Sequence, residues 1–360
     1  MIKKVILFSG LFLSLSKLHA QTAPKYSNDF LQIGVGANSL SMANSVTASV
    51  NDVTAGYWNP AGLMGVKGDI ETALMHDEYI GGIAQHDYLA LSYRFDSVSV
   101  FGLSVIRFGI DDIPYTIDLV DPTGNVNYNN ITSFSDAQYA FLFSYARSFK
   151  HLPGLTLGAN VKVIRSVIGD FASSWGFGLD AGAQYHYKNW LFGAVGKDIT
   201  STFNAWSYNL SQDLIKVFEE TGNEIPQNGL EITLPSLQIG AARTFTCFHE
   251  KVSIMPELGA NITFDGQRNT LISTNPVSID PHIGIEAGYK SIIFLRLGVG
   301  NIQTSSDQTG AAATYFSPDF GVGIKIKSFT LDYALTDNTT AGLYSNIFSI
   351  KFDINKKPAK

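Results

Sequence analysis

The chain has 360 residues, of which 16% are charged and 12% aromatic, and its net charge is -6. Charged residues are scarcer and aromatic residues commoner than in ordinary soluble domains. The acidic balance and the lack of a basic stripe argue against nucleic-acid binding. The single cysteine, Cys247, excludes a disulfide-stapled domain.

The first twenty residues have the pattern of a secretory signal. Two lysines precede a mostly apolar run from Val5 to Leu15, and Ala20 ends the segment ahead of Gln21. This arrangement predicts a cleaved signal peptide over residues 1–20. No later run reaches the roughly 18 apolar residues of a membrane-spanning helix. No cysteine follows the signal to accept a lipid, so we do not expect a lipoprotein.

Residues 21–67 differ in kind from the rest of the chain and predict a small N-terminal hatch. The stretch from Ala37 to Ala55 is rich in small and polar residues. After it, Asn59 can cap a short helical turn, Pro60 suits the first helical position, and Gly62 suits the exit. The alternative is an isolated tight turn, which Asn-Pro often makes by itself.

From residue 68 onward, segments with period-2 alternation recur, rich in Tyr, Phe, Val, Ile and Leu and separated by turn residues. They predict about fourteen strands. The expected strands are residues 68–76, 84–95, 98–109, 137–149, 155–166, 175–187, 190–198, 235–246, 251–264, 281–289, 292–300, 316–326, 329–335 and 344–352.

The alternation is clearest from Tyr139 to Ala146, where rings occupy one face and mostly small residues the other. In the last strand, Phe348, Ile350 and Phe352 share one face, while the pattern breaks at residues 346–347. A lipid-facing band and a more polar lumen explain both patterns. The three apolar residues of the last strand are a candidate barrel-insertion signal.

The connections alternate between short and long. Residues 96–97, 150–154, 188–189, 247–250, 290–291 and 327–328 are short, whereas residues 110–136, 199–234, 265–280 and 301–315 are long. Outer-membrane barrels have this asymmetry, with tight periplasmic turns and long external loops. It predicts both chain ends on the periplasmic side.

The predicted fold is therefore all-β: a transmembrane antiparallel barrel of about 14 strands over residues 68–353, with a polar periplasmic tail at 354–360. A soluble sandwich or propeller also alternates. It has no reason to sort its connections into two length classes, and its outward faces would carry more Lys and Glu. A closed barrel satisfies every backbone group in lipid.

The ionisable residues give little sign of catalysis. The seven histidines lack metal-ligand spacing, so we predict no metal and no cofactor. A hydrolytic group could be imagined from His86, Asp87, Asp111 and Asp112, but His86 and Asp87 are adjacent and point to opposite faces of a strand. Asp118, Asp121 and Asp136 could hold calcium, but ordinary hydration of a long loop is the better explanation of these residues. We do not expect an enzyme.

A helix is predicted from Ser211 to Glu220 inside the longest loop. Its apolar residues are Leu214, Ile215, Val217 and Phe218. We expect it to pack over the barrel mouth. An alternative role is binding of a partner or gating of a ligand, because exposed apolar loop surface often marks an interaction site.

The motif Asn59-Pro60-Ala61-Gly62-Leu63, placed just before a run of strands, resembles the hatch of the FadL superfamily, which has fourteen-stranded barrels. The stretch from Asp29 through Leu63 looks most like the PorV/PorQ branch. The resemblance covers the mature chain, including Leu234-Pro235 as the opening of the eighth strand. Relatives usually carry paired glycines where this chain has Ala43 and Asn44, which predicts less close packing there.

This resemblance implies a non-enzymatic role in the cell outer membrane. Barrels of the PorV type receive cargo proteins from the type IX translocon and present them for attachment at the cell surface. The implied partners are therefore outer-membrane lipid, the translocon, attachment-complex proteins and secreted cargo. The alternative is FadL-like uptake of hydrophobic small molecules. A plugged barrel with long external loops can do either.

Overall fold

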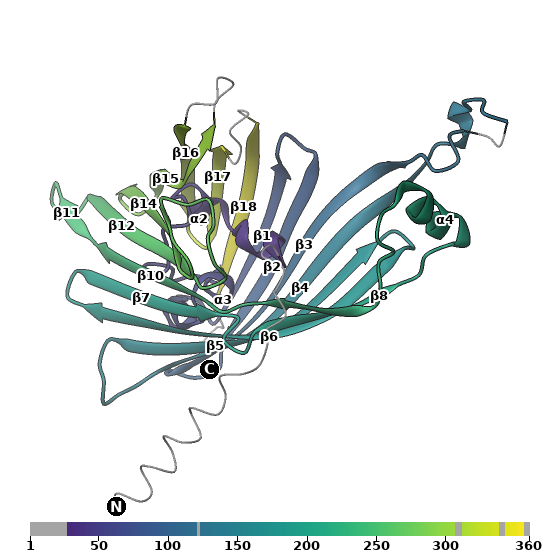
Figure 1. Ribbon diagram of the computed structural model, residues 1–360. Helices are drawn as coiled ribbons and strands as arrows, with labels where there is room; N and C mark the ends of the chain where they lie inside the picture. Colours follow the sequence, from purple (N-terminus) through teal and green to yellow (C-terminus); the bar gives the residue numbers. More distant parts are fainter. Residues whose placement is uncertain (1–26, 121–122, 307–311, 338–342, 356–360) are drawn as a thin grey trace, which may run out of the picture.

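The computed structural model describes residues 27–120, 123–306, 312–337 and 343–355. All strands belong to one antiparallel sheet that closes on itself, because β1 pairs with both β2 and β18 (Figure 1). The strands are β1 (Ile70–Tyr79), β2 (Ala84–Arg94), β3 (Ser99–Tyr115), β4 (Thr132–Ser148), β5 (Leu155–Ile168), β6 (Ala172–Tyr187), β7 (Trp190–Lys197), β8 (Thr202–Tyr208), β9 (Gly229–Thr233), β10 (Ser236–Arg243), β11 (Phe245–Cys247), β12 (Val252–Thr263), β13 (Ile272–Ser273), β14 (Ser278–Tyr289), β15 (Ile293–Ser306), β16 (Ala312–Ile326), β17 (Phe329–Asp337) and β18 (Tyr344–Ile354).

These segments form fourteen continuous wall strands, which we call staves. β7 and β8 together make stave 7, because both pair with β6, one at each end. β9, β10 and β11 make stave 8. In it, β9 pairs with β8, β10 pairs with β7, and β11 pairs with β12. The two residues of β13 lie in the connection before β14 and only pair with it. The predicted number of strands is confirmed.

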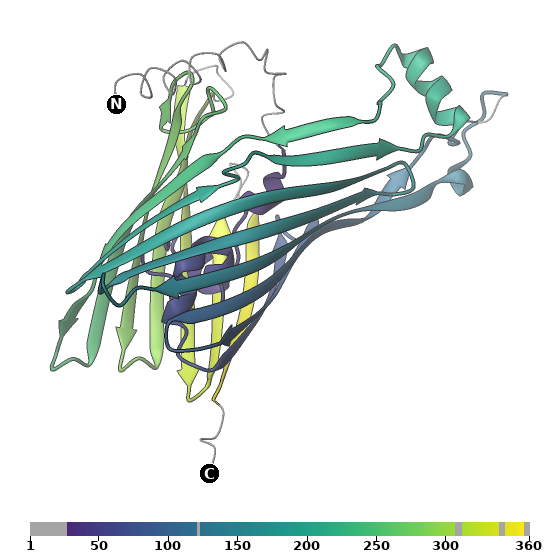
Figure 2. The same cartoon turned by 90° about the horizontal axis from the view of Figure 1, so that it is seen from below.

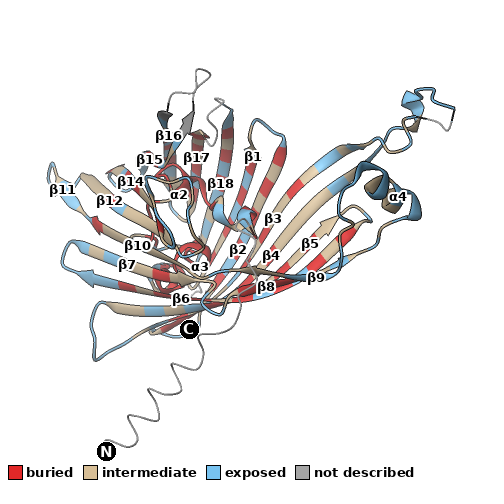
Figure 3. Cartoon of the chain, viewed as in Figure 1, coloured by how far each residue is buried: buried red, intermediate tan, exposed pale blue. Residues whose placement is uncertain are grey.

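The two faces of the wall differ as the alternation predicts (Figure 3). Along β4, Ala140, Leu142 and Ser144 are buried inside the barrel, whereas Phe143 is 53% exposed on the outside. In β18 the alternation continues without a break, since Ile347 is buried and Asn346 lies on the outer side. The outer face is therefore the apolar one, as contact with lipid requires.

Stave 7 corrects the sequence prediction. The segment 199–234 was expected to be one loop, but β8 and β9 extend the wall into it and only residues 209–228 connect them. Stave 7 is interrupted at residues 198–201, and stave 8 is interrupted beside it at Leu234-Pro235. We call these residues the wall break. Leu234-Pro235 therefore lies within the eighth strand of the barrel and does not open it, contrary to the expectation from the resemblance. Asp198 and Ser201 adopt left-handed φ angles there, which accounts for the missed continuity.

The hatch fills the barrel between the staves (Figure 2). It consists of short helical turns joined by irregular chain. The helices are η1 (Asp29–Gln32), α2 (Ala37–Leu40), α3 (Ala55–Trp58) and η2 (Pro60–Gly65) in the hatch, and η3 (Tyr128–Asn130) and α4 (Gln212–Thr221) in the long connections. In the described parts of the chain, no helix is long and apolar enough to cross a membrane.

The described residues bear on the predicted position of the C-terminal end of the barrel, whereas the N-terminal end of the chain lies outside them. β18 finishes opposite the start of β1, at the end with the short turns. The first described residue, Ser27, instead hydrogen-bonds Thr233 and Asn204 beside the wall break. The predicted signal peptide and residues 356–360 of the predicted tail lie outside the described residues.

Candidate functional site

The hatch motif forms the turn that the sequence predicts, with one correction. Asn59 has an extended backbone, and its side-chain oxygen accepts a hydrogen bond from the N–H of Ala61 at 3.2 Å. Pro60 begins η2. Gly62 does not end the turn, because η2 continues to Gly65. A side chain at Gly62 would overlap the carbonyl oxygen of Val50, so close packing inside the hatch explains this glycine.

Charged side chains of the wall fix the hatch in place. Lys351 on β18 donates to Asp52 at 2.6 Å. Glu71 on β1 accepts from the backbone N–H of Val53 at 2.6 Å, and Glu257 on β12 accepts from that of Ala48 at 2.7 Å. The bond between Lys351 and Asp52 joins two charged groups, and such hydrogen bonds are stronger than neutral ones. The hatch is thus held from several sides of the barrel.

Glycines in the wall let the hatch backbone approach closely. A methyl group at Gly158 on β5 would overlap Pro60 and Ala61, and one at Gly193 on β7 would overlap Thr47. A methyl group at Gly298 on β15 would likewise overlap Ala43. The hatch therefore leaves little free space on these sides.

The expected loosening at Ala43 and Asn44 is not observed. Both residues adopt left-handed φ angles, 50° and 65°, which glycine accepts more readily. Ala43 is nevertheless buried, because the glycines of β15 leave space for it. Close packing at Ala43 is therefore preserved by glycines of the wall and not by glycines of the hatch.

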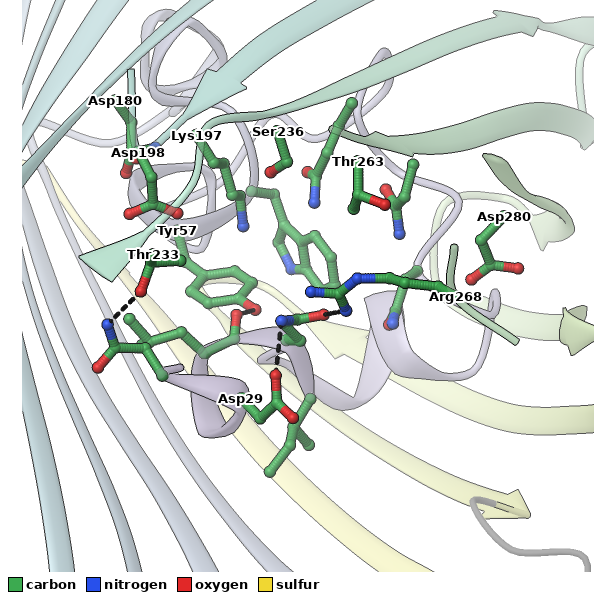
Figure 4. Close-up of a pocket in the computed structure, with 18 of the residues that line it drawn as sticks. Asp29, Tyr57, Asp180, Lys197, Asp198, Thr233, Ser236, Thr263, Arg268 and Asp280 are labelled. Atoms are coloured by element: carbon green, nitrogen blue, oxygen red, sulfur yellow. Dashed lines mark hydrogen bonds between the residues drawn. The ribbon is translucent and has the colours of Figure 1, made fainter. Parts of the chain in front are cut away.

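An external pocket lies between the hatch and the wall, toward the end with the long connections. Its volume is about 440 Å³, and both edges of the wall break line it. On the side of β5 to β7, Lys162 contacts Asp180 at 2.9 Å and Asp198 at 2.5 Å. Lys197 has no acidic partner within ion-pair distance among the described residues, and its ammonium lies 4.1 Å from the centre of the Tyr57 ring. Figure 4 shows this group beside the ring.

The mouth of the external pocket is bordered by η1 and the connection after β12. Arg268 pairs with Asp265 and reaches across the pocket toward Gln32, which also donates to Asp29 (Figure 4). Burial alone would raise the pKa of Asp265, but Arg268 holds that pKa below its usual value. Burial raises the pKa of Asp29. On the other side of η1, Asn28 donates to Thr233 at 2.8 Å.

The external pocket is not apparent from the sequence. Its residues come from staves that are distant in sequence, and no local motif marks them. One signal was present: Lys162, Asp180 and Asp319 are charged residues at lumen-facing positions of wall strands. Buried charges in a barrel wall require partners or a ligand, so they indicate a site.

The residues considered for catalysis are not brought together. His86 is buried inside the barrel, whereas Asp87 faces outward and pairs with His76 at 2.7 Å and Arg107 at 3.2 Å. Arg107 also contacts Asp111. These carboxylates therefore belong to an outer-surface ion-pair group.

The loop residues considered for calcium are likewise separate. Asp118 is exposed, Asp136 lies within β4, and Asp121 is outside the described residues. No set of three or more His, Cys, Asp or Glu side chains in the described ranges is grouped so that it could hold a metal ion.

The loop helix and the last strand have clear positions. α4 spans Gln212–Thr221, with Ser211 as its cap, and its four apolar residues are half-buried. It lies beyond the ends of β8 and β9, away from the hatch, so it does not cover the mouth as expected (Figures 1 and 2). Phe348, Ile350 and Phe352 all point outward and are 39–52% exposed.

Comparison with known proteins identifies the fold. No protein-family model and no curated protein sequence matches the chain. Among solved structures, the toluene transporter TodX of P. putida is similar with a TM-score of 0.56 and 14% identity, over 90% of this chain and 99% of that one. The CymD monoaromatic hydrocarbon channel has a TM-score of 0.55 and 12% identity, over 90% and 98%. A Pseudomonas aeruginosa FadL homologue has 0.52 and 12%, over 89% and 98%.

At these identities the similarity establishes the fold alone, and the narrower PorV/PorQ resemblance rests on the hatch sequence. The similarity extends over nearly the full length of each of these structures. Together with the apolar outer face, it places the protein in the outer membrane. The chain therefore has the FadL-like fold: a closed antiparallel barrel of fourteen strands filled by an N-terminal hatch.

Proposed function

We propose that this protein is an outer-membrane channel that takes up small molecules, with the external pocket as the place where they first bind. The observation that carries this proposal is the position of the pocket. It lies outside the hatch, and the two edges of the wall break line it. The fold similarity supports the same class, since the similar proteins are described as toluene and monoaromatic hydrocarbon transporters.

The contacts of the hatch define the possible routes. The hatch is tied to β1, β12 and β18, so a molecule in the external pocket cannot pass without either displacing part of the hatch or leaving through the wall. The wall break is the weaker barrier, because cross-strand pairing is missing there. Within the break, the N–H of Ile199 still donates to the carbonyl of Leu179 on β6, and the N–H of Asp198 donates to the carboxylate of Asp180.

An uptake assay with a pocket-filling variant tests this proposal. Ser236→Trp places a large ring in the external pocket, whereas Gln227→Trp places the same ring in the exposed connection after α4. Cells that depend on the barrel for entry of a radiolabelled amphiphile should lose uptake with Ser236→Trp and keep it with Gln227→Trp. Equal uptake by both variants, at equal outer-membrane levels, would show that the pocket is not on the route.

A second candidate is cargo handling in type IX secretion, as the PorV/PorQ resemblance of residues 29–63 implies. The specific observation in its favour is α4. Its half-buried apolar residues, Leu214, Ile215, Val217 and Phe218, lie on an arm of the wall that extends away from the lumen. Such a surface suits contact with a protein better than transport of a small molecule.

Two strains separate the candidates. Replacing residues 209–228 with a short Gly-Asn linker removes α4 and leaves β8 and β9 intact. Under the secretion candidate, cargo proteins should remain unprocessed or detached in this strain, while small-molecule uptake stays normal. Under the uptake proposal, Ser236→Trp should reduce uptake while cargo attachment stays normal.

A further inference from the structure

The wall of the external pocket opposite Lys197 contains hydrogen-bond acceptors that meet no donor. Asp280 on β14 and Asp319 on β16 each have a carboxylate oxygen with no hydrogen-bond partner. Asp319 is 9% exposed and His282 is 7% exposed, so both are more than nine-tenths buried. Buried polar groups are normally hydrogen-bonded, and exceptions of this kind indicate a site that is incomplete without a ligand.

His282 adds a third acceptor. Its Nδ1 lies 3.2 Å from the carbonyl oxygen of Ala43. A carbonyl can only accept, so Nδ1 carries the hydrogen, and Nε2 of the neutral ring is then an acceptor. This Nε2 has no partner either. Gln238 and Asn44 contribute further unpaired amide oxygens to the same pocket.

The charge in the external pocket is unevenly distributed. On one side, Lys162 and Lys197 balance Asp180 and Asp198. On the other, Arg268 is paired with Asp265. The carboxylates of Asp280 and Asp319 form no ion pair with a described cation, and Figure 4 shows Asp280 across the pocket from Lys197. This side therefore attracts positive charge.

The same cavity also has an apolar part. Leu31 and Ile33 of the hatch line it, as do Leu234 and Pro235 of the wall break. A ligand that satisfies the whole pocket needs hydrogen-bond donors and a positive charge at one end and a small apolar body at the other.

We propose that the external pocket selects organic amines, with the ammonium group held on the side lined by Asp280, His282 and Asp319 and the apolar body facing Leu31, Ile33 and Pro235. This inference deepens the proposed uptake function by naming its substrate class. An ammonium group is a cation that carries only hydrogen-bond donors, which suits a side of the pocket that carries unpaired acceptors. A hydrocarbon would leave them unpaired, and a carboxylate would be repelled.

Binding to the purified protein in detergent tests this inference directly. Isothermal titration would compare three probes of similar size: 2-phenylethylamine, 2-phenylethanol and 3-phenylpropanoate. We expect the amine to bind about tenfold or more tightly than the alcohol, since hydrogen bonds to charged groups are the stronger ones. The propanoate should bind more weakly than both. Equal affinities for amine and alcohol would overturn the inference without any variant being needed.

Variants test whether Asp280 and Asp319 cause the preference for the amine over the alcohol. The double variant Asp280→Asn/Asp319→Asn keeps shape and hydrogen bonding but removes both charges, so it should abolish the preference for the amine and leave alcohol binding within about twofold. Asp118→Asn, in the exposed connection after β3, is the matched control. An unchanged amine preference in the double variant would contradict the inference.

Flux into proteoliposomes separates this inference from the proposed function. Tight amine binding without amine flux would contradict the uptake function and leave the binding specificity in place. Flux of the alcohol and the amine at equal rates, with equal affinities, would contradict the amine specificity and leave the uptake function in place.

Discussion

Single residues decide how closely the hatch approaches the wall. Gly158 faces the backbone of Pro60 and Ala61 with no room for a methyl group. We expect Gly158→Ala to destabilise the hatch by about 1–3 kcal/mol, the usual cost of overpacking. Hydrogen exchange of hatch amides would measure it. Gly229→Ala, at a site with open space, is the control, and equal exchange rates in the two variants would contradict the close contact.

Asn59 stabilises the hatch in two ways. Its oxygen caps η2, and its amide donates to Thr47 at 2.9 Å and to Ala183 on β6 at 3.1 Å. Asn59→Ala should therefore cost more than the roughly 1 kcal/mol of a cap alone. Asn51→Ala, at an exposed hatch position, should have little effect. Entry of a large antibiotic into cells would report the difference, and equal sensitivity of the two strains would count against it.

At the scale of elements, a buried ion pair between Lys351 and Asp52 attaches the hatch to β18, beside a hydrogen bond from the N–H of Ala37 to Ser349. Burial alone would raise the pKa of Asp52, but Lys351 and the hydrogen bonds from Thr54 hold that pKa below its usual value. Lys351→Met leaves the Asp52 carboxylate buried without its cation and should cost about 3–5 kcal/mol. Asp52→Asn in the same chain should recover part of this loss.

The direction of the pKa shift at Asp52 sets the pH dependence. Because its folded-state pKa is depressed, the ion pair contributes fully above the unfolded value of about 3.9 and is lost as pH falls through the folded value. Hatch protection against exchange should thus stay constant from about pH 7 to pH 5 and weaken only below about pH 4. Weakening already near pH 6 would show that another group controls the attachment.

The last strand provides a test of assembly. Phe352 points outward near the end of β18 and is 45% exposed. Phe352→Asp should lower the amount of barrel in the outer membrane, because we expect this strand to be the insertion signal. Leu157→Asp puts the same charge on the outer face of β5, where the cost of a charge near the interface is small. Equal membrane levels of the two variants would contradict a special role for β18.

For the whole molecule, sequence alone predicted the fold well because the barrel is built on a local rule. Alternation along each strand sets which side faces lipid, and it needs no knowledge of neighbouring strands. The rule failed where the chain departs from it. At the wall break, Leu234 and Pro235 interrupt stave 8, and the left-handed residues around Ile199 interrupt stave 7, so β8 and β9 resembled loop.

The external pocket could not be predicted in the same way. Asp180, Gln238, Asp280 and Asp319 come from four different staves, and their approach depends on barrel closure and on the hatch. Sequence shows only that each is polar at an inward position. The pairing of Lys162 with Asp180, and the lack of a partner for Asp280, are properties of the assembled barrel.

The way the hatch is enclosed constrains the order in which the barrel forms. The hatch immediately precedes β1, and it contacts β5, β7, β12, β15 and β18, all the way around the wall. Its backbone rests against glycines such as Gly193 with no clearance, so it cannot be threaded into a barrel that has already closed. The seam between β1 and β18 must therefore form last, around a hatch that is already in place. Closure of the membrane barrel and exclusion of water from its interior are then one event.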